Sequence, residues 1–401
     1  MSFEITSKLL ANITSYIEVS NDKAIVALFE EMHYADIAEI LDELSFDNVV
    51  YIIKLLDSEK TSAVLMELDE DIREKTLQNL SAKEIAEEVE ELDSDDAADI
   101  IGELSQERQE AVLSKIEDEE HVKEIEELLA YDEDSAGGLM AKELVKVNEN
   151  WTVLKCVREM RAQAEEVTRV HSIYVVDDND KLKGRLSLKD LLITSTKTAI
   201  SEVYIPKVDF VNVHDNLDEV SNKMRKYDLE AIPVIDNNGV LLGRITIDDI
   251  VDVIKEEADK DYQLAAGLTQ DVEADDSILQ LTKARLPWLF LGLLGGVGAF
   301  LIMVMFENTF DENAVLFFFT PLIAAMAGNV GVQSSAIIVQ GLANDDVKGS
   351  INSRLIKEML LAALNGLVLA LFLFVFVWFY EGKINTALAI SVSLVAVIIV
   401  A

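Results

Sequence analysis

The sequence predicts a multidomain membrane protein. An all-α N-terminal domain with a superhelical stack of helices is followed by two α/β domains in tandem, a long connecting helix and an α-helical transmembrane bundle. Three observations predict this organisation. Residues 1–130 contain no Pro and one Gly, two later blocks of sequence resemble each other, and four long runs without Asp, Glu, Lys or Arg follow them.

Residues 1–130 form the expected N-terminal domain. Their apolar residues recur at i, i+3, i+4 and i+7, which is typical of amphipathic helices. Segments 35–44, 83–92 and 95–104 resemble each other, and short repeated helices bury their apolar faces on their neighbours in a stack. His33 has no Cys or His partner nearby, so it is expected to cap a helix or pack in the core rather than bind a metal.

Residues 131–199 and 200–254 are expected to form the two α/β domains. Segment 172–190 matches segment 231–249, and each copy has the pattern of a strand, a polar turn, a second strand and a helix. A glycine pair just before the first copy predicts a turn between the helical domain and the repeats. The sequence therefore predicts a tandem repeat.

The two copies resemble a pair of CBS (cystathionine-β-synthase) domains. The resemblance implies that an adenine nucleotide such as ATP is held through its ribose by Ser187 and Asp190 in the first copy and by Thr246 and Asp249 in the second. The same residues also suit a helix cap with an acidic residue in the first turn. That arrangement needs no ligand and is the simpler interpretation.

The helix of the second domain is predicted to continue as a connecting (plug) helix into a linker, residues 255–282. Asp249 and Asp252 lie at helical spacing along it, and Glu257 and Asp261 are four residues apart. Like charges at such spacing destabilise a helix in water. A hard divalent cation that bridges carboxylates is expected to neutralise them, whereas a solvated helix face that tolerates the repulsion is the alternative.

Residues 283–401 form the expected transmembrane domain. A helix needs roughly 20 apolar residues to cross the hydrocarbon core, and four charge-free runs reach or approach that length. The first run lies too far along the chain to be a signal peptide. The last run stops at Ala401 without a polar flank, so the bundle is expected to be truncated. The four predicted spans are 287–306, 314–343, 359–380 and 384–401.

Basic residues near the span ends predict the orientation in the plasma membrane. Lys283 and Arg285 precede the first span, and Lys348, Arg354 and Lys357 lie between the second and third. The loop between the first and second spans has acidic residues only. Since Lys and Arg accumulate in short cytoplasmic loops, the N-terminus and the soluble domains are expected to be cytoplasmic.

The charge distribution favours divalent cations as partners. The net charge is −40, and residues 1–282 contain 67 acidic and 28 basic residues. This excess argues against nucleic acid, whose binding needs Lys and Arg, although a solubilising surface is the alternative. A single cysteine, Cys156, fits a reducing cytosol. The chain has no Gly-x4-Gly-Lys-Ser/Thr or His-Glu-x-x-His motif, so an enzyme is not expected.

The second span carries an unusual polar segment for a membrane helix. Pro321, Gly328 and Gly331 permit a bend or a close backbone approach, which a membrane tolerates where the backbone lines a water-filled path. Asn329 and Gln333 offer uncharged oxygens to a hydrated ion. We expect these five residues to line a pore; packing between helices through small and amide residues is the alternative.

The order of these parts, together with Arg285-Leu-Pro-Trp-Leu and the Pro-x6-Gly-Asn-x-Gly-x-Gln segment, resembles the MgtE-type magnesium transporter family. The resemblance implies a homodimer with five membrane helices per protomer and a pore on the dimer axis. It also implies that the cytoplasmic region closes the pore when intracellular Mg²⁺ is high. The pore carboxylate of the family lies in the fifth helix, and no carboxylate is predicted inside the four spans here.

The resemblance also implies regulatory Mg²⁺ sites between the helical domain, the CBS pair and the connecting helix. Lys260 stands where the family can place an acidic residue, which removes one expected contact. Gating mainly by adenine nucleotide is the alternative to gating by Mg²⁺. The implied regulatory residues are Asp95, Asp99, Gly138, Asp218, Asp228, Asp249, Asp252, Glu257 and Asp261.

Overall fold

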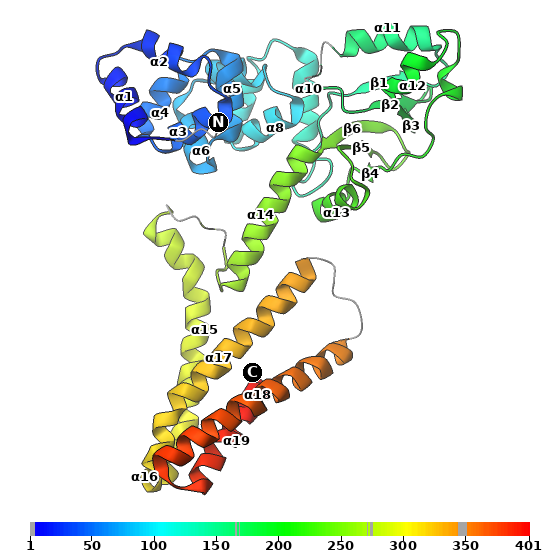
Figure 1. Ribbon diagram of the computed structural model, residues 1–401. Helices are drawn as coiled ribbons and strands as arrows, with labels where there is room; N and C mark the ends of the chain where they lie inside the picture. The colour runs from blue at the N-terminus through cyan, green and yellow to red at the C-terminus, as the bar shows by residue number, and fades with distance from the viewer. Residues whose placement is uncertain (1–4, 165–166, 168, 271, 273–275, 344–350) are drawn as a thin grey trace. The chain divides into compact units, whose positions relative to one another are not determined.

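A computed structural model describes residues 5–164, 167, 169–270, 272, 276–343 and 351–401 (Figure 1). The chain forms two compact units, Met1–Val253 and Ile254–Ala401. The first contains the helical domain and the tandem repeat, and the second contains the membrane helices.

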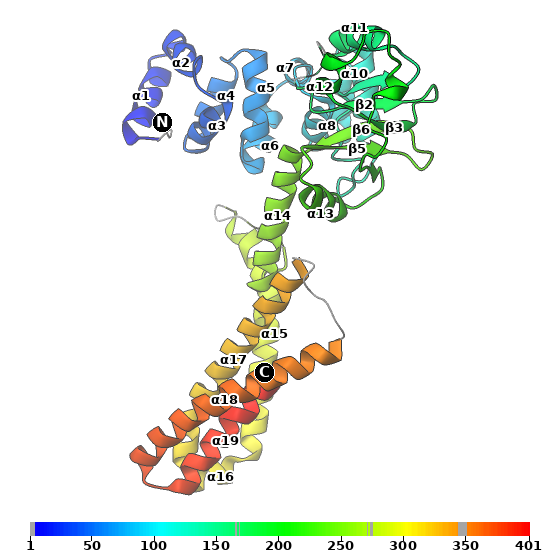
Figure 2. The ribbon, with the colours of Figure 1, turned by 45° about the vertical axis from the view of Figure 1, so that its right-hand side comes forward.

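The N-terminal domain is a stack of short helices. Helices two positions apart in the chain contact each other, so α3, α5, α7 and α9 form one row, while α4 contacts α6 and α8 contacts α10 (Figure 2). This packing confirms the predicted superhelical stack. The helices are α1 Ser7–Glu18, α2 Asp22–Phe29, α3 Tyr34–Asp42, α4 Phe46–Ile53, α5 Ser58–Glu67, α6 Glu70–Asn79, α7 Ala82–Val89, α8 Ser94–Gly102, α9 Gln106–Leu113 and α10 Glu119–Leu128.

Short polar caps start the helices of the stack. Thr6, Asp57 and Asp118 accept hydrogen bonds from the first backbone N–H groups of α1, α5 and α10, and Ser81 forms a reciprocal capping box with Glu84 at α7. His33 Nδ1 accepts a hydrogen bond from the Ala35 N–H at 3.3 Å and so caps α3.

The tandem repeat consists of two three-stranded sheets with the same topology. In each sheet the first strand is parallel to the second and the second is antiparallel to the third. The first repeat contains β1 Val145–Asn148, α11 Val153–Gln163, β2 Ile173–Val176, β3 Leu182–Leu186, α12 Leu188–Ile193 and the short η1 Ile200–Glu202. The second contains β4 Val211–Asn212, α13 Leu217–Tyr227, β5 Ala231–Ile235, β6 Leu241–Thr246 and α14 Ile247–Ala265.

The chain passes from the stack to the second repeat before it forms the first. Ala136 N–H donates to Asp215 O at 2.8 Å, and Gly137 N–H donates to Val213 O at 2.9 Å. A Cβ on Gly137 would lie 2.7 Å from side-chain atoms of Tyr131 and Val213. The glycine pair therefore permits a close approach as well as a turn. One apolar core runs from the stack into the second repeat.

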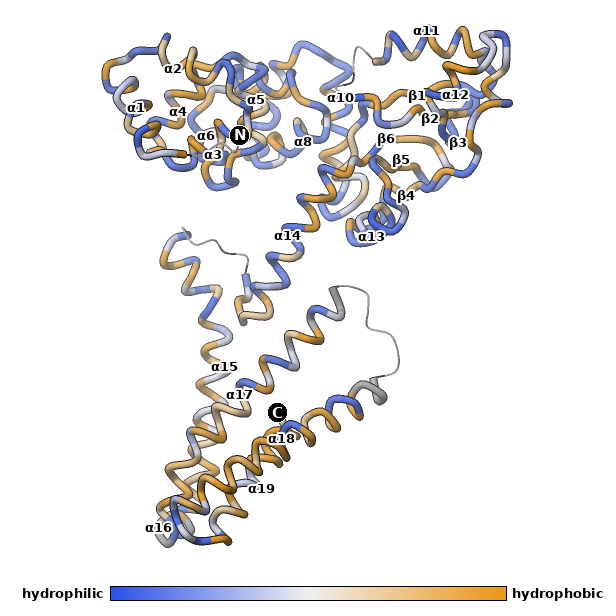
Figure 3. The backbone as a smooth tube through the Cα atoms, viewed as in Figure 1, coloured by the Kyte–Doolittle hydropathy of each residue, from blue (hydrophilic) through white to orange (hydrophobic). Residues whose placement is uncertain are grey.

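The second unit is a set of apolar helices: α15 Ile278–Met305, α16 Glu307–Glu312, α17 Ala314–Ala343, α18 Ile351–Glu381 and α19 Ile384–Val400. Among the described residues, three are long and apolar enough to cross a membrane, at Ile278–Met305, Ala314–Ile338 and Leu355–Glu381 (Figure 3). The fourth predicted span is the apolar helix α19, whose 17 residues fall short of that length.

The membrane helices pack through one shared core. α19 contacts both α17 and α18, and the core includes Phe319, Leu373, Val377, Ile390 and Leu394. At Gly366 a Cβ would come within 3.5 Å of the Val395 Cα, so a small residue lets α18 and α19 approach closely.

The connecting helix ends inside the predicted segment 255–282. α14 ends at Ala265, and the chain then turns at Gly267, whose φ is +83°. A Cβ on Gly267 would lie 2.7 Å from the Trp288 ring, and Thr269 donates through both N–H and hydroxyl to Ala284 O. These contacts fold the chain back onto the start of α15, and glycine is the residue that the positive φ favours.

Candidate functional site

The N-cap and the first two turns of α8 carry four carboxyl groups. Asp93 is the N-cap residue, and Asp95, Asp96 and Asp99 follow on the helix. The unpaired N–H groups at a helix N-terminus favour negative charge, which explains why acidic residues are tolerated there. Four carboxylates are more than the positive end of one helix dipole can balance.

Glu143 adds a fifth carboxylate from outside the stack. Its Oε1 accepts a hydrogen bond from the Ser94 N–H at 3.0 Å, and its Oε2 accepts one from the Ser94 hydroxyl at 2.9 Å. The Lys142 N–H donates to the same hydroxyl at 2.9 Å. The segment that leads into β1 is therefore held against the start of α8.

Arg244 places a buried guanidinium at this junction. Its backbone pairs with Ala141 through hydrogen bonds of 2.8 and 2.9 Å. Its Nε donates to Glu143 O at 2.6 Å, and its Nη2 lies 3.3 Å from Asp93 Oδ2. Arg244 on β6 thus joins the second repeat to the helical stack.

Asp249, in the first turn of α14, also lies near the carboxyl groups of α8. Its Oδ2 accepts hydrogen bonds from the Thr246 N–H at 3.0 Å and the Thr246 hydroxyl at 2.5 Å. Its charge contributes to the raised pKa values of Asp95 and Asp96. We call Asp93, Asp95, Asp96, Asp99, Glu143 and Asp249 the acidic cluster.

The carboxyl groups of the acidic cluster are short of positive charge. Burial raises the pKa of Asp95 well above its usual range and that of Asp96 to about 7, with repulsion from Asp249 as a further cause. Asp99 lies at the exposed edge, where loss of part of its hydration raises its pKa to about 6 although Arg73 opposes the change. Burial also raises the pKa of Asp249 against the hydrogen bonds from Thr246.

The acidic cluster suits a hard divalent cation. Asp93, Asp95 and Glu143 each offer an oxygen atom, and these atoms lie within 4.8 Å of one another. Mg²⁺ takes oxygen ligands, often one or two carboxylates with retained waters. A cation there would also favour ionisation of carboxyl groups whose pKa values burial has raised.

The structure brings some of the predicted regulatory residues together. Asp95, Asp99 and Asp249 belong to the acidic cluster, and Asp252 lies exposed on the next turn of α14. Gly138 lies in the adjoining turn, where a Cβ would be 2.9 Å from Glu133 Cα. The charge of Glu133 in turn contributes to the raised pKa of Asp99.

Other predicted residues lie elsewhere. Asp218 and Asp228 stand at opposite ends of α13, one in its first turn and the other as its left-handed C-cap. Ten residues of helix separate them by ~15 Å, so the two carboxylates of one chain cannot share an ion. Glu257 and Asp261 lie four residues apart on the part of α14 that belongs to the second unit.

The sequence reasoning missed four members of this junction: Asp93, Asp96, Glu143 and Arg244. Asp93 and Asp96 flank a predicted ligand in sequence, so their proximity was a usable signal. Glu143 is 49 residues from Ser94, and Arg244 is 151 residues from Asp93. No local pattern indicates pairings of that length.

The two candidate nucleotide residue pairs differ. Thr246 is bonded to Asp249 by two hydrogen bonds, so this pair closes the start of α14 by itself. Ser187 makes no side-chain capping bond to α12. The two repeats therefore present unlike surfaces at their equivalent helix starts.

The predicted pore residues lie on α17. This helix is continuous through Pro321, and a Cβ added at Gly328 or Gly331 would meet no atom of the described chain within 4 Å. Asn329 and Gln333 are exposed, four residues apart. The structure therefore leaves the small and amide residues uncovered and shows no break of the helix at the glycines.

A carboxylate next to α17 was also missed. Ser334 Oγ donates to Glu358 Oε1 at 2.8 Å. Glu358 lies one residue before the charge-free run at 359–380, but it falls inside the apolar helix segment Leu355–Glu381. The apolar helix segment that contains the third predicted span begins at Leu355, before the charge-free run, and so carries Glu358 in its first turn.

Three family models match the chain in the order in which its parts occur. "MgtE intracellular N domain" matches residues 32–134, "CBS domain" matches 136–195 and 200–256, and "Divalent cation transporter" matches 320–401. The matches cover the helical stack from α3 onward, both repeats and the membrane unit from residue 320.

Several known proteins are similar to the chain. A magnesium transporter MgtE of Thermus thermophilus is 33% identical over 98% of this chain and 88% of its own length. An MgtE of Enterococcus faecalis is 34% identical over 68% of this chain and 60% of its own length.

Two solved structures resemble the first unit. The soluble part of a magnesium transporter is 28% identical, with a TM-score of 0.55 over 63% of this chain and 98% of that one. The cytosolic domain of the Mg²⁺ channel MgtE in complex with ATP is 33% identical, with a TM-score of 0.57 over 61% of this chain and 99% of that one. The chain therefore belongs to the MgtE family of magnesium transporters.

Proposed function

We propose that the acidic cluster is the sensor through which intracellular Mg²⁺ regulates transport by this MgtE family member. The convergence of carboxylates from three parts of the chain carries the proposal. They come from α8, from the segment before β1 and from the start of α14. An ion bound among them would therefore act on the docking of the helical stack against the second repeat.

Repulsion between carboxylates supplies the switch. Without a cation, Asp95 and Asp96 repel Asp249, and this repulsion opposes the docking that Arg244, the hydrogen bonds of Ser94 and the apolar core favour. Bound Mg²⁺ would supply two positive charges that these carboxylates share. A ligand that binds the docked arrangement more tightly than the undocked one shifts the equilibrium toward docking.

α14 would transmit the change. Asp249 lies in its first turn, and the helix continues without interruption to Ala265 in the second unit. Fixing the start of this helix would limit its movement and hold the transporter closed at high Mg²⁺. Loss of the ion would release it.

We place the second unit in the plasma membrane and the first in the cytoplasm, with membrane lipid around the apolar helices. Lys283, Arg285 and Lys357 at the ends of apolar helices support this orientation. We also propose a homodimer. The uncovered glycine-bearing surface of α17 supports a second copy as its partner, with Asn329 and Gln333 beside the ion path.

Gating by adenine nucleotide is the second candidate. A relative's cytosolic domain is known in complex with ATP, and Ser187 makes no capping bond that a ribose would have to displace. Asp249 belongs to both candidate sites, but its Oδ2 already accepts two hydrogen bonds from Thr246. The nucleotide would therefore gain less at the second repeat than at the first.

Calorimetric titration of the detergent-solubilised chain with Mg²⁺ tests the sensor. Asp95→Asn removes one charge from the acidic cluster at nearly constant volume and is expected to weaken Mg²⁺ binding by at least about tenfold, or ~1.4 kcal/mol. Asp47→Asn, an exposed residue on α4, is the matched control and should bind as the unmodified chain does. Equal affinities for Asp95→Asn and Asp47→Asn would remove the acidic cluster as the sensor.

A further inference from the structure

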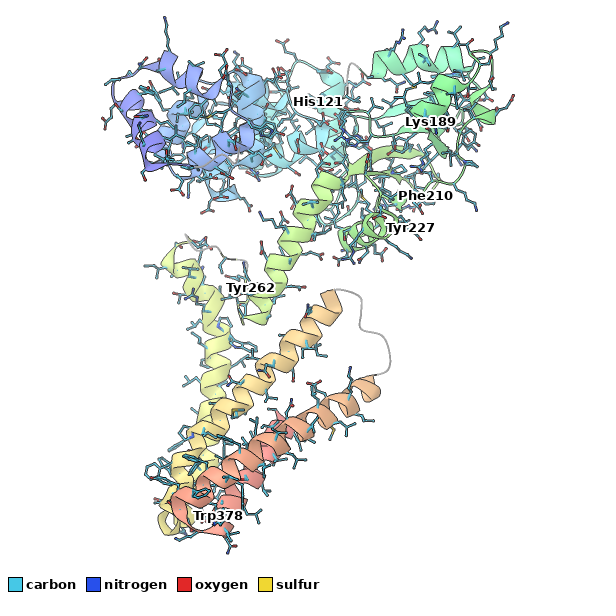
Figure 4. All side chains as sticks on the ribbon, in the orientation of Figure 1. His121, Lys189, Phe210, Tyr227, Tyr262 and Trp378 are labelled. Atoms are coloured by element: carbon cyan, nitrogen blue, oxygen red, sulfur yellow. The ribbon has the colours of Figure 1, made fainter. Side chains whose placement is uncertain are left out.

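A second group of metal-ligating side chains lies on the other side of Glu143. His121 and Glu124 on α10 and Glu143 each offer one ligand atom, and these three atoms lie within 4.8 Å of one another. Figure 4 labels His121 on α10. Only Glu143 is shared with the acidic cluster, and none of the three was expected from the sequence to bind a metal.

The fold orients the two ligands on α10. Residues three apart on a helix lie on one face, so His121 and Glu124 point the same way. The start of α10 is fixed by Asp118, whose Oδ1 accepts hydrogen bonds from the N–H groups of Glu120 and His121 at 2.8 and 3.2 Å. Ile125 of α10 is buried in the apolar core, which sets the rotation of this face about the helix axis.

A backbone carbonyl group also orients the His121 side chain. Its Nε2 lies 3.3 Å from the carbonyl oxygen of Val89, at the end of α7. A neutral imidazole that donates Nε2–H to this carbonyl keeps its lone pair on Nδ1. Hydrogen bonding of one ring nitrogen to a backbone carbonyl is the usual arrangement of a histidine whose other nitrogen binds a metal.

Glu143 is oriented in the same manner. Both of its carboxylate oxygens accept hydrogen bonds from Ser94, and each oxygen retains a lone pair for a further partner. The side chains of His121 and Glu143 are thus positioned by groups that are not themselves ligands.

We propose that His121, Glu124 and Glu143 form a binding site for a divalent transition-metal ion of the Zn²⁺ or Co²⁺ type. The imidazole decides the class of ion, because nitrogen ligands suit Zn²⁺, Co²⁺ and Ni²⁺, whereas Mg²⁺ requires oxygen ligands and sheds water reluctantly. Two carboxylates and one imidazole give three protein ligands, and water would complete a tetrahedral set. The ion would tie α10 to the segment before β1.

Zinc binding in excess Mg²⁺ tests this site, independently of the proposed Mg²⁺ sensor. The full chain in detergent is stripped with a chelator, saturated with Mg²⁺ and titrated with Zn²⁺ by calorimetry. One Zn²⁺ per chain is expected to bind the unmodified protein. His121→Gln and Glu124→Gln should each weaken that binding by at least about tenfold, and circular dichroism checks that both variants fold.

Two control variants give the test its specificity. His214→Gln removes an exposed imidazole elsewhere in the first unit and should leave Zn²⁺ binding unchanged. Asp249→Asn, which weakens the Mg²⁺ sensor, should also leave it unchanged. Absence of Zn²⁺ binding in excess Mg²⁺ would overturn the proposal. Equal Zn²⁺ affinities for the unmodified chain, His121→Gln and Glu124→Gln would overturn it as well, because His121 would then have no role beyond its hydrogen bond to Val89.

Discussion

Arg244 is a built-in cation of the acidic cluster. Its side chain is 7% exposed and pairs with Asp93, whose side chain is 28% exposed. Arg244→Met keeps the apolar stem and removes the charge, so Asp93 and its neighbours lose a counter-charge. Removing one partner of a buried ion pair is strongly destabilising, and we expect a loss of about 2–3 kcal/mol in unfolding free energy without divalent cations.

Chemical denaturation with and without Mg²⁺ measures this effect. Mg²⁺ should raise the unfolding free energy of Arg244→Met by more than it raises that of the unmodified chain, because the ion supplies the missing positive charge. Arg225→Met is the control, since Arg225 is exposed on α13 and bonds only locally to Asn222. If Mg²⁺ stabilises Arg244→Met and the unmodified chain equally, Arg244 does not act as a counter-charge of this cluster.

Glu88 gives the helical stack a pH dependence of its own. Burial raises its pKa from 4.5 to about 7, although Ser58 donates a hydrogen bond to its Oε2 at 3.0 Å. A carboxyl group whose pKa is raised by folding keeps its proton to a higher pH in the folded state than in the unfolded state. Its contribution to stability is therefore full below about pH 4.5 and falls as the pH rises to about 7.

Glu88→Gln should remove this contribution to the pH dependence. The variant keeps an acceptor for Ser58 but cannot ionise, so its thermal midpoint should exceed that of the unmodified chain above pH 7 and fall less steeply between pH 5 and 7. Glu87→Gln, on the same helix but paired with Lys83 at the surface, is the comparison. Parallel midpoint curves for Glu88→Gln and the unmodified chain would contradict the assignment.

The polar face of α17 predicts where water enters the membrane unit. Asn329 is exposed on this helix, whereas the row Phe319, Ile323, Met326 and Val330 packs in the core. In a Cys156→Ala background, Asn329→Cys should react with a charged thiol reagent at least about tenfold faster than Phe372→Cys. Thiolate formation needs water, and Phe372 is 78% exposed on an apolar helix that we assign to lipid. Similar labelling rates at the two positions would exclude a water-filled path beside Asn329.

Local periodicity was sufficient to predict most elements of the fold. The helical stack, the two repeats and three long apolar helices follow from apolar spacing and from the match of 172–190 to 231–249. α14 ends at Ala265, inside the predicted connecting segment, and Gly267 then turns the chain with its positive φ. The hydrogen bond between Glu358 and Ser334 on α17 was not predicted either, because the two residues are 24 positions apart in the chain.

The candidate site depends on how separate parts of the first unit meet. The sequence indicates that α8 and α14 begin with acidic residues, and both do. It does not indicate that Ala136, Gly137 and Ala141 pair with the second repeat. That pairing places Glu143 and Arg244 at the start of α8, and it arises from contacts between residues distant in the chain.

In the proposed mechanism, Mg²⁺ docks the helical stack against the second repeat through the acidic cluster. A ligand that binds the docked state protects it in proportion to its occupancy. Limited proteolysis of the full chain in detergent, titrated with Mg²⁺ and with Na⁺ at matched ionic strength, measures this protection directly at residues 132–142. Asp95→Asn/Asp249→Asn is compared with Asp47→Asn/Glu107→Gln, which removes two exposed charges.

Mg²⁺ is predicted to slow cleavage at residues 132–142 in the unmodified chain and in the exposed-charge control. It should do so at concentrations where Na⁺ has no effect. In Asp95→Asn/Asp249→Asn, Mg²⁺ should no longer slow cleavage. Equal protection by Na⁺, or undiminished Mg²⁺ protection of Asp95→Asn/Asp249→Asn, would contradict the account.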